Sequence, residues 1–147
     1  SESAVTMTEI VLPSHGNALG TIFGGTVMSW IDIAAAIAAQ KHSRSIVVTA
    51  SIDALHFIAP VKVGHVVHIK ASVNFAGKTS MEVGVEVYSE DLNTGERRHA
   101  NSCLVNFVAL DKKGRPMPVP TLVTETPQEK ERFAQARERR KQRLGHD

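Results

Sequence analysis

The segment NALGTIFGGTVMSWIDIAAAIAAQ, residues 17–40, decides the fold of this 147-residue chain. From about Gly25 onward, apolar side chains surround a helical cylinder, from Val27 through the alanine-rich run to Ala39. A helix that is apolar all round is normally buried on every side. This apolar run is shorter than the about 20 apolar residues that a membrane span requires. We therefore predict a core helix without a solvent face, ending near His42.

Asp32 is the one charged residue inside this apolar run. A carboxylate in a core is costly unless another group pairs with it or the protein uses it. Gly24 and Gly25 precede the helix, where the backbone lets a ligand approach and free N–H groups point at developing negative charge. The pattern favours a functional Asp32, and the alternative is an Asp32 that only caps a neighbouring loop.

Asp32 and Gly25 lie two helical turns apart on the same face. At about 1.5 Å per residue, their separation along the helix axis is roughly 10 Å. One small reacting group cannot touch both. The helix start that works with Asp32 is therefore expected to belong to a second copy of the chain, which predicts a two-fold dimer with composite sites.

Composition excludes several classes of protein. A hydrophobic content of 42% with 22% charged residues is ordinary for one globular domain. A net charge of +2 with 5% aromatic residues argues against a nucleic-acid partner, and the single Cys103 excludes an intrachain disulfide framework. No signal-peptide pattern opens the chain, so we expect a cytoplasmic protein without a membrane partner. The seven histidines form no ligand set, and no metal is expected.

After the helix, the hydrophobic period changes from 3.6 to 2, which predicts strands. An antiparallel sheet with one inner face needs a cover, and the apolar helix is the candidate. We predict an α+β fold in which about five strands wrap around a central buried helix. The expected strands are residues 5–12, 46–58, 66–76, a strand from Met81 to Tyr88, and 97–110.

The character of the chain changes after Leu110, where three prolines keep it extended. Thr126 and Pro127 form a good helix start, and a mostly charged helix follows. We divide the chain into a domain of residues 1–124 and a charged C-terminal helix and tail of residues 125–147. The charged helix is expected to be solvated, and the alternative is a phosphate-binding fringe for a nucleotide-bearing ligand.

Four blocks in this order resemble the acyl-CoA thioesterases with a hot-dog fold, particularly the cytosolic acyl-CoA hydrolase branch in its single-domain form. The resemblance covers nearly the whole chain. The blocks are Asn17-x-x-Gly20-x-x-Phe23-Gly24-Gly25 with Asp32 following, Val48 to Asp53, Lys78 to Glu82, and Gly114 to Pro120.

The resemblance implies hydrolysis of a fatty acyl-CoA to free fatty acid and CoA. It places the catalytic carboxylate at Asp32 and an amide at the thioester at Asn17, contributed by different subunits. It implies a homodimer that assembles further into a trimer of dimers, a hexamer. Coenzyme A is then part of the substrate and product, and no separate cofactor is expected.

The chemistry also follows from the residues. A thioester carbonyl develops an oxyanion on attack, and a preorganised donor such as the Gly25 N–H contributes about 3 kcal/mol. Gly24 keeps the approach open. Asp32 acts as general base on water or attacks directly to form a mixed anhydride, and both routes remain open. Asn17 polarises the carbonyl or orients the water, and the alternative for it is an ordinary turn residue.

The resemblance also places the CoA track on two segments. Edge-strand N–H groups can bind the pantetheine amides as an added strand would, and Lys78 is placed for phosphate, although turn lysines are often only solvated. Thr49 lines the reaction centre or is structural, and Met28 and Trp30 shape an acyl tunnel or are plain core. The segments are Ala50, Ser51 and Ile52, and Lys78, Thr79, Ser80 and Met81.

Two rival functions remain. A hot-dog dehydratase acting on hydroxyacyl thioesters needs a histidine paired with an acid near the helix start, and His15 lies close to Asn17 in sequence. A non-catalytic acyl-CoA sensor would bind the same ligand without turnover. Release of free thiol from acyl-CoA separates the sensor from the enzyme.

Overall fold

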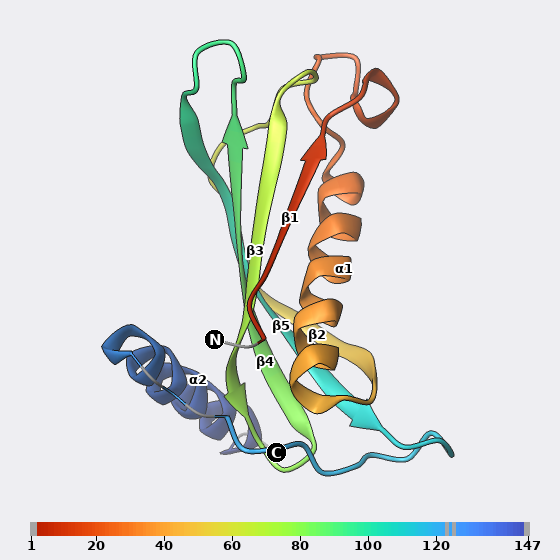
Figure 1. The fold of residues 1–147 in the computed structure, drawn as a ribbon, viewed down its shortest axis with the longest axis vertical. Coiled ribbons are helices and arrows are strands. Elements are labelled where there is room, and N and C mark those ends of the chain that lie inside the picture. The colour runs from red at the N-terminus through yellow and green to blue at the C-terminus, as the bar shows by residue number, and fades with distance from the viewer. Residues whose placement is uncertain (1–2, 123, 125, 146–147) are drawn as a thin grey trace.

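The computed structural model describes residues 3–122, 124 and 126–145. The strand predicted over residues 5–12 ends at Ile10, and the strand predicted over residues 46–58 ends at Phe57. The strand of residues 97–110 has the predicted bounds. Figure 1 shows the elements, which are β1 (Val5–Ile10), η1 (Pro13–His15, a short 3-10 turn), α1 (Gly24–Ser43), β2 (Ile46–Phe57), β3 (Val66–Ala76), β4 (Ser80–Glu90), β5 (Arg97–Leu110) and α2 (Pro127–Gly145). In this described part of the chain, no helix is long and apolar enough to cross a membrane.

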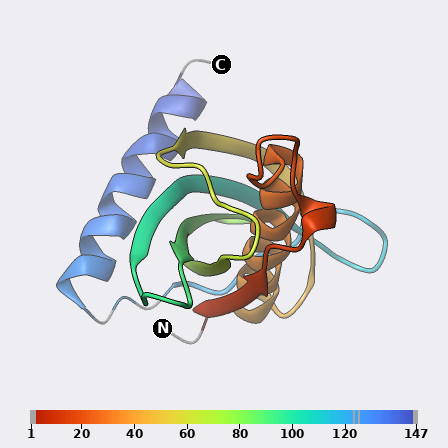
Figure 2. The ribbon, with the colours of Figure 1, turned by 90° about the horizontal axis from the view of Figure 1, so that it is seen from above.

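The five strands form one antiparallel sheet with the order β1-β3-β4-β5-β2. The sheet curls around α1 (Figure 2). This arrangement confirms the predicted α+β fold with a central helix. It also makes β2, which follows α1 directly in the chain, an edge strand.

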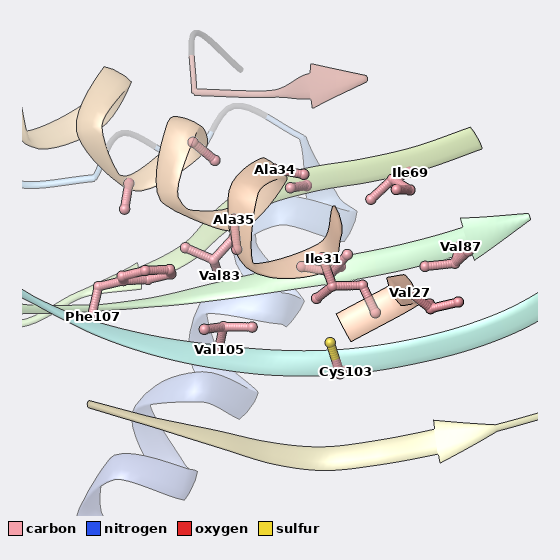
Figure 3. Close-up of a cluster of buried hydrophobic side chains, with 14 of the residues drawn as sticks. Val27, Ile31, Ala34, Ala35, Ile69, Val83, Val87, Cys103, Val105 and Phe107 are labelled. Carbon is pink, nitrogen blue, oxygen red and sulfur yellow. The ribbon is translucent and has the colours of Figure 1, made fainter. Parts of the chain in front are cut away.

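One face of α1 packs against the sheet and contributes to the core. Val27, Ile31, Ala34 and Ala35 point at the inner face of the sheet (Figure 3). Ile31 and both alanines are fully buried. The small alanine side chains let the helix approach the strands closely, as native packing density requires. The inward positions of β3, β4 and β5 complete the cluster with Ile69, Val83, Val87, Cys103, Val105 and Phe107.

The prediction that α1 has no solvent face is wrong for the single chain. Ile33 is 46% exposed and Ile37 is 38% exposed. These residues are one turn apart, on a face that the sheet of the same chain does not cover. The edge strand β2 also exposes large apolar side chains, those of Ile46, Val48 and Ile52. The apolar pattern of α1 therefore predicts a helix that is buried on more sides than a single copy of the chain can cover.

The helix α2 lies across the sheet on the side opposite α1 (Figure 2). This helix was predicted to be exposed to solvent, and Arg137 and Glu138 are exposed. Three other residues, Phe133, Ala136 and Arg139, pack against the sheet. The ring of Phe133 lies 5.0 Å from that of Phe75, and Ala136 is fully buried. Arg139 binds both carboxylate oxygens of Glu82, which is 1% exposed. The helix is thus anchored on the outer face of β3 and β4. The domain boundary at residue 124 stays a prediction.

Cys103 lies in the core and is only 3% exposed. Its burial raises the pKa of the thiol to about 12 from an ordinary 9.0, and the nearby negative charge of Glu86 adds to this effect. We expect the folded protein not to react with a thiol dye at pH 8, because the thiolate is the reactive form. The unfolded state releases this proton near pH 9 and the folded state does not, so stability is lost as pH rises from 9 towards 12.

Denaturant titrations of wild type and Cys103→Ala across this pH window check the sign. The variant should lose less stability than wild type between pH 9 and 12. Equal losses in the two proteins, or rapid labelling of native Cys103, would contradict the prediction.

Candidate active site

The start of α1 presents free backbone N–H groups. Phe23 is the N-cap residue, in extended conformation and without a side-chain cap. Its carbonyl accepts hydrogen bonds from Thr26 (3.0 Å) and Val27 (3.3 Å). Within the described residues, no partner accepts the N–H of Gly24 or Gly25, and both glycines are exposed. A Cβ at either position would meet nothing within 4 Å. The helix start can therefore receive an anion or a developing oxyanion.

Asn17 holds the loop in front of this helix. Its Oδ1 accepts hydrogen bonds from the N–H of Leu19 (2.9 Å) and of Thr21 (3.3 Å), and its Nδ2 donates to Thr21 Oγ1 (3.0 Å). An amide nitrogen has two hydrogens, so one remains for another acceptor. Asn17 therefore stabilises the turn, and its contact with a substrate carbonyl stays a prediction.

Asp32 lies in the middle of α1 and is half-buried rather than fully buried as predicted. Its Oδ1 accepts a hydrogen bond from Thr49 Oγ1 at 2.8 Å. Among the described residues, no other group donates to this carboxylate, so Oδ2 is available. Thr49 comes just before a bulge in β2 at Ala50, where the strand changes register against β5. The contact ties the carboxylate of α1 to the edge strand.

Asp32 and the glycine pair share one unbroken helix, Gly24–Ser43. The separation of roughly 10 Å that follows from the helical rise therefore applies to the folded chain. One copy presents a carboxylate and a set of free N–H groups that cannot converge on the same small group. If Asp32 and the helix start act on the same thioester, they must come from two copies of the chain, as the sequence predicts.

The two segments predicted to bind CoA flank the same end of β5. Ser51 pairs with Asn106 and Ser80 pairs with Val108, on opposite sides of that strand. Neighbouring strands lie about 4.8 Å apart, so the segments are about 10 Å from each other. Ala50 and Ile52 are exposed on the edge strand, whereas Ser51 accepts a hydrogen bond from Asn106 Nδ2 at 3.0 Å.

The predicted CoA-binding residues in and after the turn between β3 and β4 differ in their exposure. Lys78 is exposed and Thr79 is half-buried, but Met81 is only 1% exposed and points into the core. Its side chain is therefore not free to contact a ligand. Arg140 of α2 also lies beside this turn, because a Cβ added at Gly77 would be 3.1 Å from its Nε. The sequence did not single out this residue. Two cationic side chains thus lie beside this turn, which favours the phosphate-fringe alternative for this part of α2.

His15 does not form the pair that a dehydratase needs. Its Nδ1 accepts the Leu12 N–H at 3.0 Å, and its ring meets that of Trp30 edge-on at 5.1 Å. In the part of the chain that the structure describes, no carboxylate hydrogen-bonds to it. Trp30 and Met28 pack against the core cluster, which matches their reading as core residues.

Comparison with known proteins assigns the family. The model of the thioesterase superfamily matches residues 19–96. The acyl-CoA thioester hydrolase YkhA of Bacillus subtilis, described as uncharacterized, is 44% identical over 87% of this chain and 74% of its own length. The cytosolic acyl coenzyme A thioester hydrolase of mouse is 36% identical over 99% of this chain, which spans only 40% of that protein.

Solved structures agree. An apo-hexameric acyl-CoA thioesterase superposes with a TM-score of 0.94 at 42% identity, covering 99% of this chain and 93% of that one. The acyl-CoA hydrolase of Staphylococcus aureus, solved with butyryl coenzyme A and coenzyme A, gives a TM-score of 0.90 at 38% identity, over 99% of this chain and 88% of that one. Variants of that enzyme with an aspartate, a threonine or an asparagine replaced by alanine have also been solved. This chain belongs to the thioesterase superfamily.

Proposed function

We propose that this chain hydrolyses fatty acyl-CoA thioesters to free fatty acid and CoA, at sites formed between two copies. The hydrogen bond from Thr49 to Asp32 carries the proposal, because it holds a carboxylate in one orientation at the open side of the helix. The residues replaced in the Staphylococcus aureus variants support it. They follow one another at the same intervals along the chain as Asn17, Asp32 and Thr49.

In the proposed reaction, the thioester carbonyl lies at the helix start of one copy. The Gly25 N–H and the remaining Asn17 amide hydrogen bind its oxygen and stabilise the negative charge that develops on attack. Asp32 of the other copy, with Oδ1 held by Thr49, uses Oδ2. It either removes a proton from the attacking water or attacks the carbonyl carbon itself, giving a mixed anhydride that water then hydrolyses. The C–S bond breaks and CoA leaves as the thiolate.

A second copy explains the uncovered apolar surface. Ile33 and Ile37 on α1, with Ile46, Val48 and Ile52 on β2, leave large side chains in solvent beside an unpaired strand edge. Exposed apolar groups and open edges of this kind mark association surfaces. Two structural relatives are described as hexameric, one of them from Yersinia pestis. We therefore propose a homodimer with composite sites that assembles into a trimer of dimers.

For the CoA part of the substrate, the proposal uses the edge of β2 at Ala50 to Ile52 for the pantetheine. The phosphates would lie near Lys78 and Arg140, because these exposed and half-exposed cations stand beside the same turn. Thr79 and Ser80 would add polar contacts there. A cytoplasmic location and the lack of a separate cofactor stay predictions.

The proposal is tested by thiol release from a panel of acyl-CoAs and by mixing inactive variants. Wild type should release thiol, and Asn17→Ala and Asp32→Asn should each release far less. When the two variants are unfolded together and refolded, about half of the dimers contain one copy of each variant. Each such dimer has one site in which both Asn17 and Asp32 are intact, so about one quarter of the wild-type activity returns.

The matched control mixes Asp32→Asn with Thr49→Ala. Since Thr49 contacts Asp32 of its own copy, this mixture contains no intact site and should recover nothing beyond the activity of Thr49→Ala alone. Failure of the first mixture to recover would place both groups in one copy. Binding of acyl-CoA without thiol release from any chain length would overturn the hydrolase in favour of the sensor.

A further inference from the structure

A cavity of about 340 Å³ opens beside the start of α1. Its walls are mostly apolar, and Val27 and Val87, which lie side by side in Figure 3, form part of them. The volume is at the lower end of the range for small-molecule sites. The lining residues come from the helix start, the β2–β3 connection and the inner face of the sheet: Ile22, Gly24, Val27, Ile58, Ala59, Pro60, Val61, Val87, Ala100 and Asn101.

Asn101 is the exception to the apolar lining. It is 2% exposed, and in the described structure neither its Nδ2 nor its Oδ1 has a hydrogen-bond partner. Asn106, another buried amide on the same strand, donates to Ser51 Oγ (3.0 Å) and to Asp53 Oδ2 (2.8 Å). Buried polar side chains are nearly always paired, and an unpaired one destabilises the fold. The unpaired amide of Asn101 therefore points to a ligand group that completes it.

We infer, resting on the proposed function, that Asn101 selects acyl groups that carry an oxygen substituent close to the thioester, as hydroxyacyl and oxoacyl-CoAs do. The cavity includes Gly24, next to the N–H groups proposed to hold the thioester carbonyl, so the acyl chain enters it from that end. The apolar walls receive the methylene groups. A hydroxyl can donate to Oδ1 or accept from Nδ2, and a keto oxygen accepts from Nδ2.

The limited size of the cavity places this oxygen near the carbonyl rather than at the far end of a long chain. A purely aliphatic chain would leave both amide atoms unpaired, and a site built for a hydrogen bond rejects such an analogue. Asn101 is thus a specificity-determining residue, and the reaction itself is carried by other groups.

The test compares kcat/KM for hexanoyl-CoA, 3-hydroxyhexanoyl-CoA and 3-oxohexanoyl-CoA, measured by thiol release. Wild type should prefer at least one oxygen-bearing substrate by about tenfold or more. In Asn101→Leu, which has a side chain of similar shape, the ratio should fall to about one. Preference for the hydroxy substrate alone assigns Oδ1 as the acceptor; preference for both assigns Nδ2 as the donor.

Two results would overturn the inference while the proposed function stands: equal kcat/KM for all three substrates in wild type, or an unchanged ratio in Asn101→Leu. No thiol release from any acyl-CoA would overturn both. Because the wild-type ratio needs no variant, the test does not depend on how Asn101→Leu folds.

Thermal unfolding separates selectivity from a structural role. Asn101→Leu should keep or raise Tm, because it removes an unpaired amide, whereas Asn106→Leu should lower Tm, because Ser51 and Asp53 lose a donor. A lowered Tm in Asn101→Leu together with unchanged selectivity would show that Asn101 supports the fold, through a buried water for example, and would overturn the inference.

Discussion

Asp32→Asn is expected to lower kcat/KM for thiol release by about a hundredfold or more, the range that a general base contributes. Asparagine has the shape of aspartate, and its side-chain oxygen can still accept the hydrogen bond that Thr49 Oγ1 makes to Oδ1. The neutral amide, however, neither takes a proton from water nor attacks a carbonyl. The loss should appear in kcat, and circular dichroism and Tm should match wild type.

Thr49→Val is the matched control. It keeps the β-branched shape in β2 and the charge of Asp32, and removes only the hydroxyl that orients the carboxylate. We expect an intermediate loss of kcat, smaller than in Asp32→Asn. Full activity in Asp32→Asn would exclude Asp32 from the reaction under either the base or the anhydride route.

Arg139→Ala should lower the free energy of unfolding by about 3 kcal/mol, the effect of leaving one partner of a buried ion pair alone. Glu82 is 1% exposed on β4 and receives its charge compensation from the guanidinium of α2. The hydrogen bond to Glu82 also raises the pKa of Arg139 above its usual value, so the guanidinium is charged wherever the protein is folded. Urea or guanidinium titration measures the change.

Two further variants make this prediction specific. Arg137→Ala changes an exposed arginine on the same helix and should stay within about 0.5 kcal/mol of wild type. Adding Glu82→Met to Arg139→Ala removes the uncompensated charge and should recover much of the loss. An Arg139→Ala effect no larger than that of Arg137→Ala would mean that water compensates Glu82.

Hydrophobic periodicity was enough to predict the five strands, the central helix and the sheet that surrounds it, whereas α2 was predicted from its N-terminal capping residues. The strand of residues 66–76 has the predicted bounds, because apolar and polar residues alternate in its sequence from Val67 to Phe75. The burial departs from this alternation near the end, where the strand bulges at Asn74 and that side chain is buried as well. The change of period after His42 likewise separated α1 from β2. Alternation and helical period record which face meets a core, and these local signals survive in the sequence whatever the neighbours are.

Contacts between distant residues were not predictable in the same way. The apolar stripe of α1 says that Ile33 and Ile37 avoid water, but not whether the cover comes from the same chain. Arg139 reads as part of a charged run, and only the fold brings it to Glu82. The sequence does contain a signal for the cavity residue Asn101. It occupies an inward position in the alternation that continues with Cys103, where a polar residue is unusual.

The loop that carries Asn17 is joined to the wall of the cavity by backbone hydrogen bonds. Ile22 N–H donates to Val61 (2.8 Å), and Val63 N–H donates to Gly20 (2.9 Å). In the proposed site, we therefore expect an acyl chain that displaces the wall to shift the Asn17 amide relative to the thioester carbonyl. The fit of the acyl chain would then affect the alignment of the carbonyl. We expect a poorly fitting chain to be penalised in the transition state as well as in binding, so that substrate preference appears in kcat.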